Sequence, residues 1–192
     1  MTQLSLIIRT TLILLSTLMM GCNAFNKPLS TAQHDLGPLT EITSHDDLNA
    51  DRRMIISAPE WLNDNRLRYR QLYKTPTLVK AYSLDRWVAP PTQLLRRYFA
   101  SLPLPPDTQL RLQVIDFEQQ FDSAHSAKSL FSFSAELFDK DKKAIGTRFF
   151  RLEEANESAD AQGAIKSFVT LTRQAKNELI SWLSQTTSAS AN

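Results

Sequence analysis

The chain has 192 residues, 42% of them hydrophobic, and its 22 Lys and Arg nearly balance its 20 Asp and Glu. Without a basic excess we expect no nucleic-acid partner. Only four glycines are present, which excludes a glycine-rich P-loop, and the single cysteine excludes an intramolecular disulfide.

The amino-terminal segment carries the clearest motif. An apolar run, Thr10–Met20, follows Arg9. It is shorter than the ~20 apolar residues that span a bilayer and is typical of the hydrophobic region of a secretory signal. Met19–Cys22 resembles a bacterial lipobox, with a small residue directly before the cysteine. We predict a lipoprotein signal peptide at residues 1–21 and lipid, palmitate included, on Cys22. The alternative is an uncleaved anchor in which Cys22 is an ordinary thiol.

The residue after the cysteine bears on the destination of the chain. In lipoproteins of Gram-negative bacteria, Asp at this position usually signals retention at the inner membrane, and here the residue is Asn23. By this analogy we expect the protein at the outer membrane, on its periplasmic face, with Cys22 as the membrane attachment.

Three segments follow the signal peptide. Residues 22–52 are mostly polar and show no helical or strand period, so they are predicted to be a lipidated N-terminus and flexible tether. Their more apolar middle, residues 35–42, could add an edge strand. Residues 53–185 are predicted to form one domain, long enough to bury a core. Residues 186–192 are predicted to be a disordered tail.

The first half of the domain is predicted to be strands followed by a helix. β-branched and alternating apolar residues predict strands at 54–58, 66–71 and 77–86. Prolines then end the last strand and suit the first turn of a helix. The helix is predicted over 92–102, because its apolar residues fall on one stripe.

In the second predicted strand, residues 66–71, apolar and polar residues alternate strictly. Leu67 and Tyr69 face one side, and Arg66, Arg68 and Arg70 face the other. We interpret the arginines as a solvated strand face; the alternative is a patch for an anionic lipid or a partner.

The second half repeats the same order. Strands are predicted at 109–121, 129–138 and 145–152, and a helix at 164–184. In the first of these strands the apolar phase shifts by one residue near Val114, which predicts a bulge. Strand-strand(-strand)-helix repeated twice predicts an α+β fold, a mainly antiparallel sheet with two helices on one face.

Chemistry-bearing residues do not form a recognisable constellation. The three histidines, His34, His45 and His125, have no carboxylate or cysteine at metal-ligand spacing and are interpreted as solvated. No serine lies in a nucleophile elbow. We expect a protein that is not an enzyme and that needs no cofactor or metal.

An aromatic and proline cluster is the most distinctive part of the domain. It comprises Tyr82, Trp87, Pro90 and Pro91. Two interpretations are open: a structural corner, in which Trp87 fills the gap between the strand end and the helix start, or a surface for a peptide or subunit.

Several segments together resemble a known family. The most specific is Tyr82-Ser-Leu-Asp-Arg-Trp-Val-Ala-Pro-Pro-Thr-Gln-Leu-Leu95, which Asp35-Leu-Gly-Pro38, Ile55–Asn63 and Leu67–Arg70 accompany. With the lipobox they resemble the ABC-type transport auxiliary lipoprotein family, the PqiC-like proteins, over nearly the whole chain.

The resemblance implies a non-enzymatic partner of an MCE-type ABC transporter. Such a system comprises a permease, an ATPase and an MCE-domain protein that carries lipid across the periplasm. This lipoprotein would dock the MCE assembly at the outer membrane and help phospholipid, or another apolar molecule, to pass between membranes. Whether it acts as a homo-oligomer is open. Two alternatives remain: a periplasmic lipid-binding carrier with a pocket between sheet and helices, or an adaptor for outer-membrane assembly or secretion.

Overall fold

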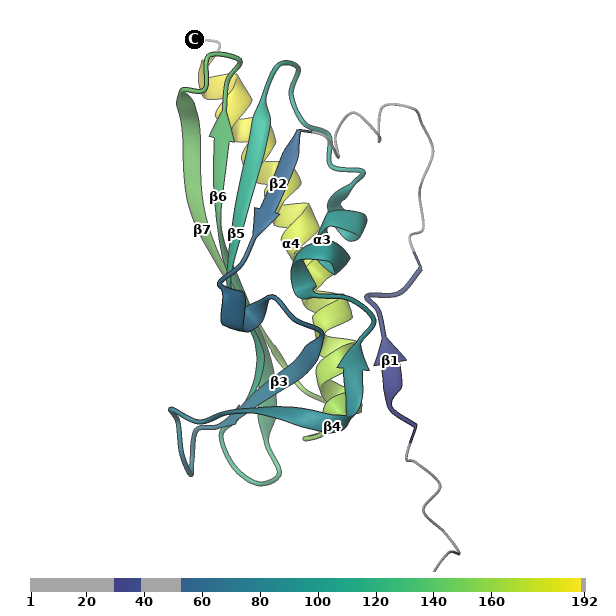
Figure 1. The fold of residues 1–192 in the computed structure, drawn as a ribbon. Helices are drawn as coiled ribbons and strands as arrows, with labels where there is room; N and C mark the ends of the chain where they lie inside the picture. The colour runs from purple at the N-terminus through teal and green to yellow at the C-terminus, as the bar shows by residue number, and fades with distance from the viewer. Residues whose placement is uncertain (1–29, 39–52, 191–192) are drawn as a thin grey trace, which may run out of the picture. The chain divides into compact units, whose positions relative to one another are not determined.

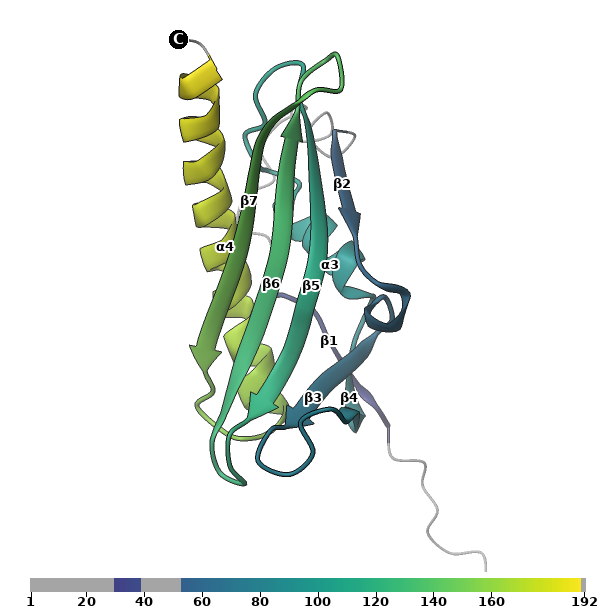
Figure 2. The same ribbon diagram turned by 90° about the vertical axis from the view of Figure 1, so that its left-hand side faces the viewer.

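The computed structural model describes residues 30–38 and 53–190, so the predicted signal peptide and Cys22 lie outside the described residues. The described chain forms a seven-stranded sheet with two α-helices on one face (Figure 1). On the other face of the sheet, no helix of the described residues lies in front of the long strands (Figure 2). The predicted α+β class is confirmed.

The elements follow the predicted order. The first part of the domain contains β2 (Met54–Ser57), the short 3-10 helix η2 (Glu60–Leu62), β3 (Arg66–Gln71), β4 (Val79–Trp87) and α3 (Pro91–Phe99). The second part contains β5 (Gln109–Phe121), β6 (Ala127–Phe138), β7 (Ala144–Ala155) and α4 (Ala161–Ser190). α3 has Pro91 in its first turn, where the missing N–H costs no helical hydrogen bond.

The strand order in the sheet is β1-β4-β3-β5-β6-β7, and β2 pairs with β5. The longest pairings, β5 with β6 and β6 with β7, are antiparallel. The sequence did not reveal the shorter parallel pairings, in which β3 and β2 run beside β5. The predicted bulge is confirmed, because the register of β5 against β6 shifts between Val114 and Asp116.

The hydrophobic core lies between the sheet and the helices. Alternate residues of β5, β6 and β7 point to the helices, and aromatic rings fill much of this layer. Phe117 of β5 stacks on Phe168 of α4 with ring centroids 4.1 Å apart, and Phe133 stacks on Phe150 across β6 and β7 at 4.8 Å. The helices therefore pack directly onto the sheet.

Two boundaries differ from the prediction. A strand, β1 (Ala32–His34), lies within the segment predicted to be a flexible tether and pairs in parallel with β4. Leu36, just after it, is buried in the core. At the other end, α4 continues to Ser190 through part of the predicted tail. There the Thr187 hydroxyl donates to the carbonyl of Leu183, within the helix.

Candidate functional site

The corner between β4 and α3 is built around Trp87. Its side chain is 1% exposed, and its ring lies 5.6 Å from those of Phe117 and Phe168. Its backbone N–H donates to the carbonyl of Asn65 at 2.8 Å. Trp87 therefore joins β4 to β5 and α4, and its buried ring is not available to a partner. Pro91 is buried as well, whereas Pro90 is partly exposed.

Tyr82, the remaining residue of that cluster, belongs to a polar network. Its hydroxyl donates to Gln119 Oε1 at 2.7 Å, and Gln119 Nε2 donates to Asn156 Oδ1 at 2.8 Å. Asn156 Nδ2 in turn donates to Ser129 Oγ and Ser167 Oγ. Gln119 is fully buried. The network joins β4, β5, β6 and α4 around this buried amide.

Burial raises the pKa of Tyr82, and the neighbouring Tyr69, Asp160 and Asp85 raise it further. The phenol thus stays a hydrogen-bond donor well into the alkaline range. Sequence reasoning missed this network, although a signal was available: Gln119 lies between Phe117 and Phe121 in the inward phase of β5.

We expect Tyr82→Phe to lower the free energy of unfolding by about 1–3 kcal/mol, because it leaves the buried Gln119 oxygen without its donor. Tyrosine in an unfolded chain ionises near pH 10. The contribution of Tyr82 to the free energy of unfolding is therefore complete below about pH 10, and it is lost as the pH rises through the raised pKa of Tyr82 in the folded protein. Urea unfolding at pH 7 and at pH 11 should show a smaller difference between the two proteins at pH 11. Tyr73→Phe, at a 43% exposed residue, is the control; an equal loss in both variants would contradict the assignment.

The three arginines of β3 were predicted to form a solvated strand face, and this prediction is wrong for two of them. Only Arg66 is solvated as expected. Arg68 is 5% exposed, with Nη1 and Nη2 donating to the Asp64 carboxylate at 2.7 and 2.8 Å and Nη2 also donating to the Trp61 carbonyl. Arg70 Nε donates to both oxygens of Glu118, at 2.7 and 2.8 Å.

The physical reason is that this face is covered. The segment that contains η2 lies against Arg68, whose guanidinium is 5.9 Å from the Trp61 ring. Glu118 comes from the neighbouring strand β5 and is itself buried. Burial alone would raise the pKa of Asp64, but hydrogen bonds from Arg68 and from the Arg66 backbone hold it below its usual range. These pairs fix β3 in place and leave neither Arg68 nor Arg70 free for an anionic ligand.

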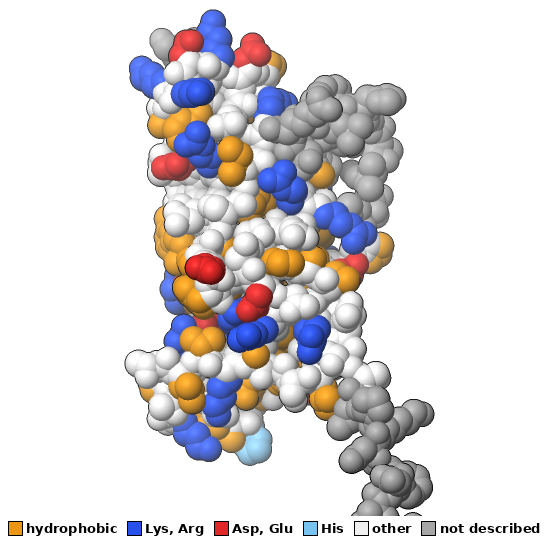
Figure 3. Space-filling view, in the orientation of Figure 1, with side chains coloured by type: hydrophobic (Ala, Val, Ile, Leu, Met, Phe, Trp, Pro, Cys, Tyr) orange, Lys and Arg blue, Asp and Glu red, His pale blue; other side chains and the backbone are white. Residues whose placement is uncertain are grey.

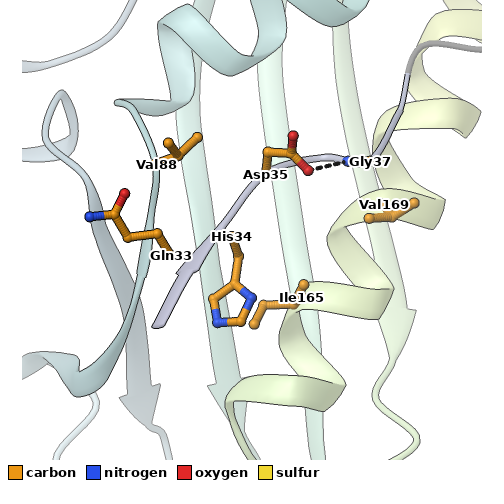
Figure 4. A pocket seen from close by; sticks show the side chains of 7 residues that line it. All are labelled: Gln33, His34, Asp35, Gly37, Val88, Ile165 and Val169. Atoms are coloured by element: carbon orange, nitrogen blue, oxygen red, sulfur yellow. Dashed lines mark hydrogen bonds between the residues drawn. The ribbon is translucent and has the colours of Figure 1, made fainter. Parts of the chain in front are cut away.

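A groove of about 450 Å³ lies where β1 and the end of β4 approach α4. In Figure 4 the His34 ring points towards Ile165 of α4, and Val88 and Val169 add apolar walls. The residues that line the groove are Gln33, His34, Asp35, Gly37, Val88, Ile165 and Val169. Val88 is 51% exposed, so the apolar surface of the groove is open to water. The apolar walls of the groove can make van der Waals contacts, and polar side chains surround them.

His34 is not the freely solvated histidine that the sequence predicted. Its Nε2 lies 2.8 Å from Asp85 Oδ1, and both side chains are about four-fifths buried. The chain then turns at Gly37, whose φ of +88° suits glycine and whose N–H donates to Asp35 Oδ1 at 2.8 Å. β1 is thus held by side-chain contacts as well as by its pairing. His125 is exposed, and His45 lies outside the described residues.

Within residues 30–38 and 53–190, no group of three or more His, Cys, Asp or Glu side chains is placed to hold a metal ion. In the same part of the chain, no helix combines the length and the apolar character needed to cross a membrane. Cys22 cannot be placed against any of these features, because it is not among the described residues.

Comparison with solved structures finds the same fold elsewhere. A Xanthomonas campestris protein of family DUF330 superposes with a TM-score of 0.63 and 19% identity, over 72% of this chain and 87% of that one. An uncharacterized protein gives 0.59 and 17%, over 79% and 97%. Both likenesses show the fold.

A third neighbour, a candidate lipoprotein of Caulobacter crescentus, reaches a TM-score of 0.35 at 19% identity, over 48% of this chain and 83% of that one. That likeness is too low to carry an argument. No protein-family model and no curated protein matches the chain.

Proposed function

We propose that this protein is a lipid-anchored periplasmic lipoprotein of the outer membrane that acts as a non-catalytic auxiliary component of an MCE-type ABC transport system. The observation that carries the proposal is the lipobox-like Met19–Cys22 at the end of a short apolar run. The family-like segment from Tyr82 to Leu95 supports it. That segment forms the end of β4 and the start of α3, so the resemblance and the observed fold describe the same junction.

The position of β1 sets the reach of such an anchor. A tether spanning residues 22–52 would extend to roughly 100 Å, whereas the segment from Cys22 to Ala32 extends to at most roughly 35 Å. Because β1 pairs with β4 and Leu36 is buried, the shorter limit applies while β1 stays docked. The domain would then stay close to the membrane that holds Cys22, and a transporter component would have to meet it there.

The dense packing beneath the helices favours a docking role over a carrier role. Rings from the sheet and from α4 lie in direct contact, as in the stacked pair Phe117 and Phe168. A carrier in the sense of the alternative needs an apolar pocket in this same layer. The open groove lies at the edge of the sheet, where β1 approaches α4, and it offers a surface on which a partner could dock.

Affinity purification of the full chain from mildly solubilised membranes tests the proposal. We expect an MCE-domain protein, with its permease and ATPase, to co-elute, and no co-elution with an unrelated lipoprotein carrying the same tag. Native mass spectrometry of the eluate reports bound lipid. Stoichiometric phospholipid without an MCE partner would favour the carrier, and neither lipid nor partner would favour the adaptor for outer-membrane assembly or secretion.

A further inference from the structure

The loop between β3 and β4 exposes large apolar side chains. Every residue from Tyr73 to Val79 is exposed, with Tyr73 at 43%, Leu78 at 48% and Val79 at 36%. Lys74 and Lys80 lie among them, and residues 71–80 contain no Asp or Glu. Clustered exposed apolar residues mark interaction sites far more often than isolated ones do. In Figure 3, hydrophobic and basic side chains lie next to one another at the lower end of the domain, where this loop is found in Figure 1.

Hydrogen bonds and ring contacts hold the loop in one conformation. Backbone N–H groups of Lys74 and Thr75 donate to the carbonyl of Gln71, and that of Leu78 donates to Thr75. Lys80 Nζ donates to Gln71 Oε1 at 2.9 Å. Below the loop, the Tyr69 ring packs against the rings of Tyr82 and Phe121 at 4.8 and 5.6 Å. The hairpin therefore presents Tyr73, Leu78 and Val79 to the outside at little cost in conformational entropy.

The direction of β1 points its amino end towards the loop. β1 is parallel to β4, with Ala32 beside Asp85. β4 starts at Val79, next to the loop, so the amino end of β1 points to the loop end of the domain, as Figures 1 and 2 show. Along β4 the loop lies at most roughly 20 Å beyond Ala32, whereas Cys22 can lie up to roughly 35 Å from Ala32. A bilayer that holds Cys22 is therefore within reach of the loop.

The charge of this region matches a phospholipid surface. Within residues 71–80 the only charged side chains are those of Lys74 and Lys80, and both are basic. Basic residues near a bilayer are attracted to lipid phosphates, tyrosine rings favour the headgroup level, and aliphatic side chains enter the boundary of the acyl region. The loop combines all three kinds of side chain.

We propose that the β3–β4 loop rests on the phospholipid bilayer that holds Cys22, with Tyr73, Leu78 and Val79 in the interface and Lys74 and Lys80 at the lipid phosphates. This inference depends on the proposed lipid attachment. With the anchor and the loop both at the membrane, the domain has a defined orientation there. The opposite end, where the β6–β7 turn at residues 139–143 lies, then points away from the bilayer.

A dye on the loop tests this contact in the full chain. Lipidated Cys22 has no free thiol, so Leu78→Cys provides a single labelling site for an environment-sensitive NBD dye. Lys140→Cys, in the exposed β6–β7 turn, is the matched control, and Thr77→Cys guards against loss of a contact that Leu78 itself makes. The labelled chains are reconstituted into phosphatidylethanolamine–phosphatidylglycerol vesicles with brominated acyl chains, and mass spectrometry of Cys22 is recorded for each preparation.

We expect bromolipid to quench the dye at residues 77 and 78 about threefold more strongly than at residue 140, because only the loop enters the interface. Equal quenching at both ends of a lipidated chain would overturn the loop contact alone. Cys22 without lipid would overturn the anchor and, with it, this inference. A dye at residue 78 that is shielded in native membranes but not in protein-free vesicles would assign the loop to a protein partner and overturn the bilayer contact.

Discussion

Cys22→Ser is expected to release the protein from the membrane fraction and to abolish incorporation of radiolabelled palmitate. Without the thiol no diacylglyceryl group can be attached. Each buried CH₂ of an acyl chain contributes about 0.8 kcal/mol to membrane binding, and one chain gives only marginal attachment, whereas several give a stable one. The loss should therefore be close to complete, even if the β3–β4 loop still touches the bilayer.

The matched variant is Asn23→Asp, which leaves the cysteine intact. It should still be labelled with palmitate, but it should move from the outer to the inner membrane fraction on a sucrose gradient, because Asp at this position signals inner-membrane retention. A Cys22→Ser chain that still incorporates palmitate and still pellets with membranes would contradict the lipoprotein proposal. An Asn23→Asp chain that stays at the outer membrane would contradict only the sorting analogy.

Trp87→Ala is expected to lower the free energy of unfolding by about 3–5 kcal/mol, the usual cost of deleting a buried aromatic side chain. Trp87 is 1% exposed, and its ring lies 5.6 Å from those of Phe117 and Phe168. The cavity would lie between the sheet and α4, where neighbouring rings can collapse only in part. Urea unfolding followed by circular dichroism measures the change.

Trp61→Ala is the control, because Trp61 is 47% exposed and its ring contacts the Arg68 guanidinium at 5.9 Å. We expect a loss of about 1 kcal/mol or less there, the range of an exposed cation–π contact. Similar losses in the two variants would mean that Trp87 is not the packing centre of the corner. A Trp87→Ala variant with wild-type stability and lost partner binding would favour the partner-surface interpretation.

Local pattern was sufficient for the long elements. The bulge in β5 was predictable because a one-residue shift in apolar phase near Val114 can keep the core face buried only if the strand gains a residue there. The helix α3 was predictable from Pro91 and one apolar stripe. In both cases the signal lies within a single element, where periodicity reports burial directly.

What the sequence did not reveal depends on partners far along the chain. β1 has three residues, none strongly apolar, and it is stabilised by the edge of β4 and by the pairing of His34 with Asp85. Alternation correctly divided β3 into two faces, but it could not show that Glu118 of β5 lies opposite Arg70. The groove has the same origin, because it forms only where β1 meets α4.

Three proposals depend on the chemical state of the amino terminus: the lipid anchor, the short distance between the domain and the membrane, and the contact of the β3–β4 loop with the bilayer. Mass spectrometry of the mature amino-terminal peptide from membrane-purified full chain measures it directly. We expect a peptide that starts at Cys22 and carries a thioether-linked diacylglyceryl group and an amide-linked acyl chain. A mature chain in which residues 1–21 are still attached, or in which Cys22 has a free thiol, would contradict the proposal that this domain works as a membrane-anchored lipoprotein.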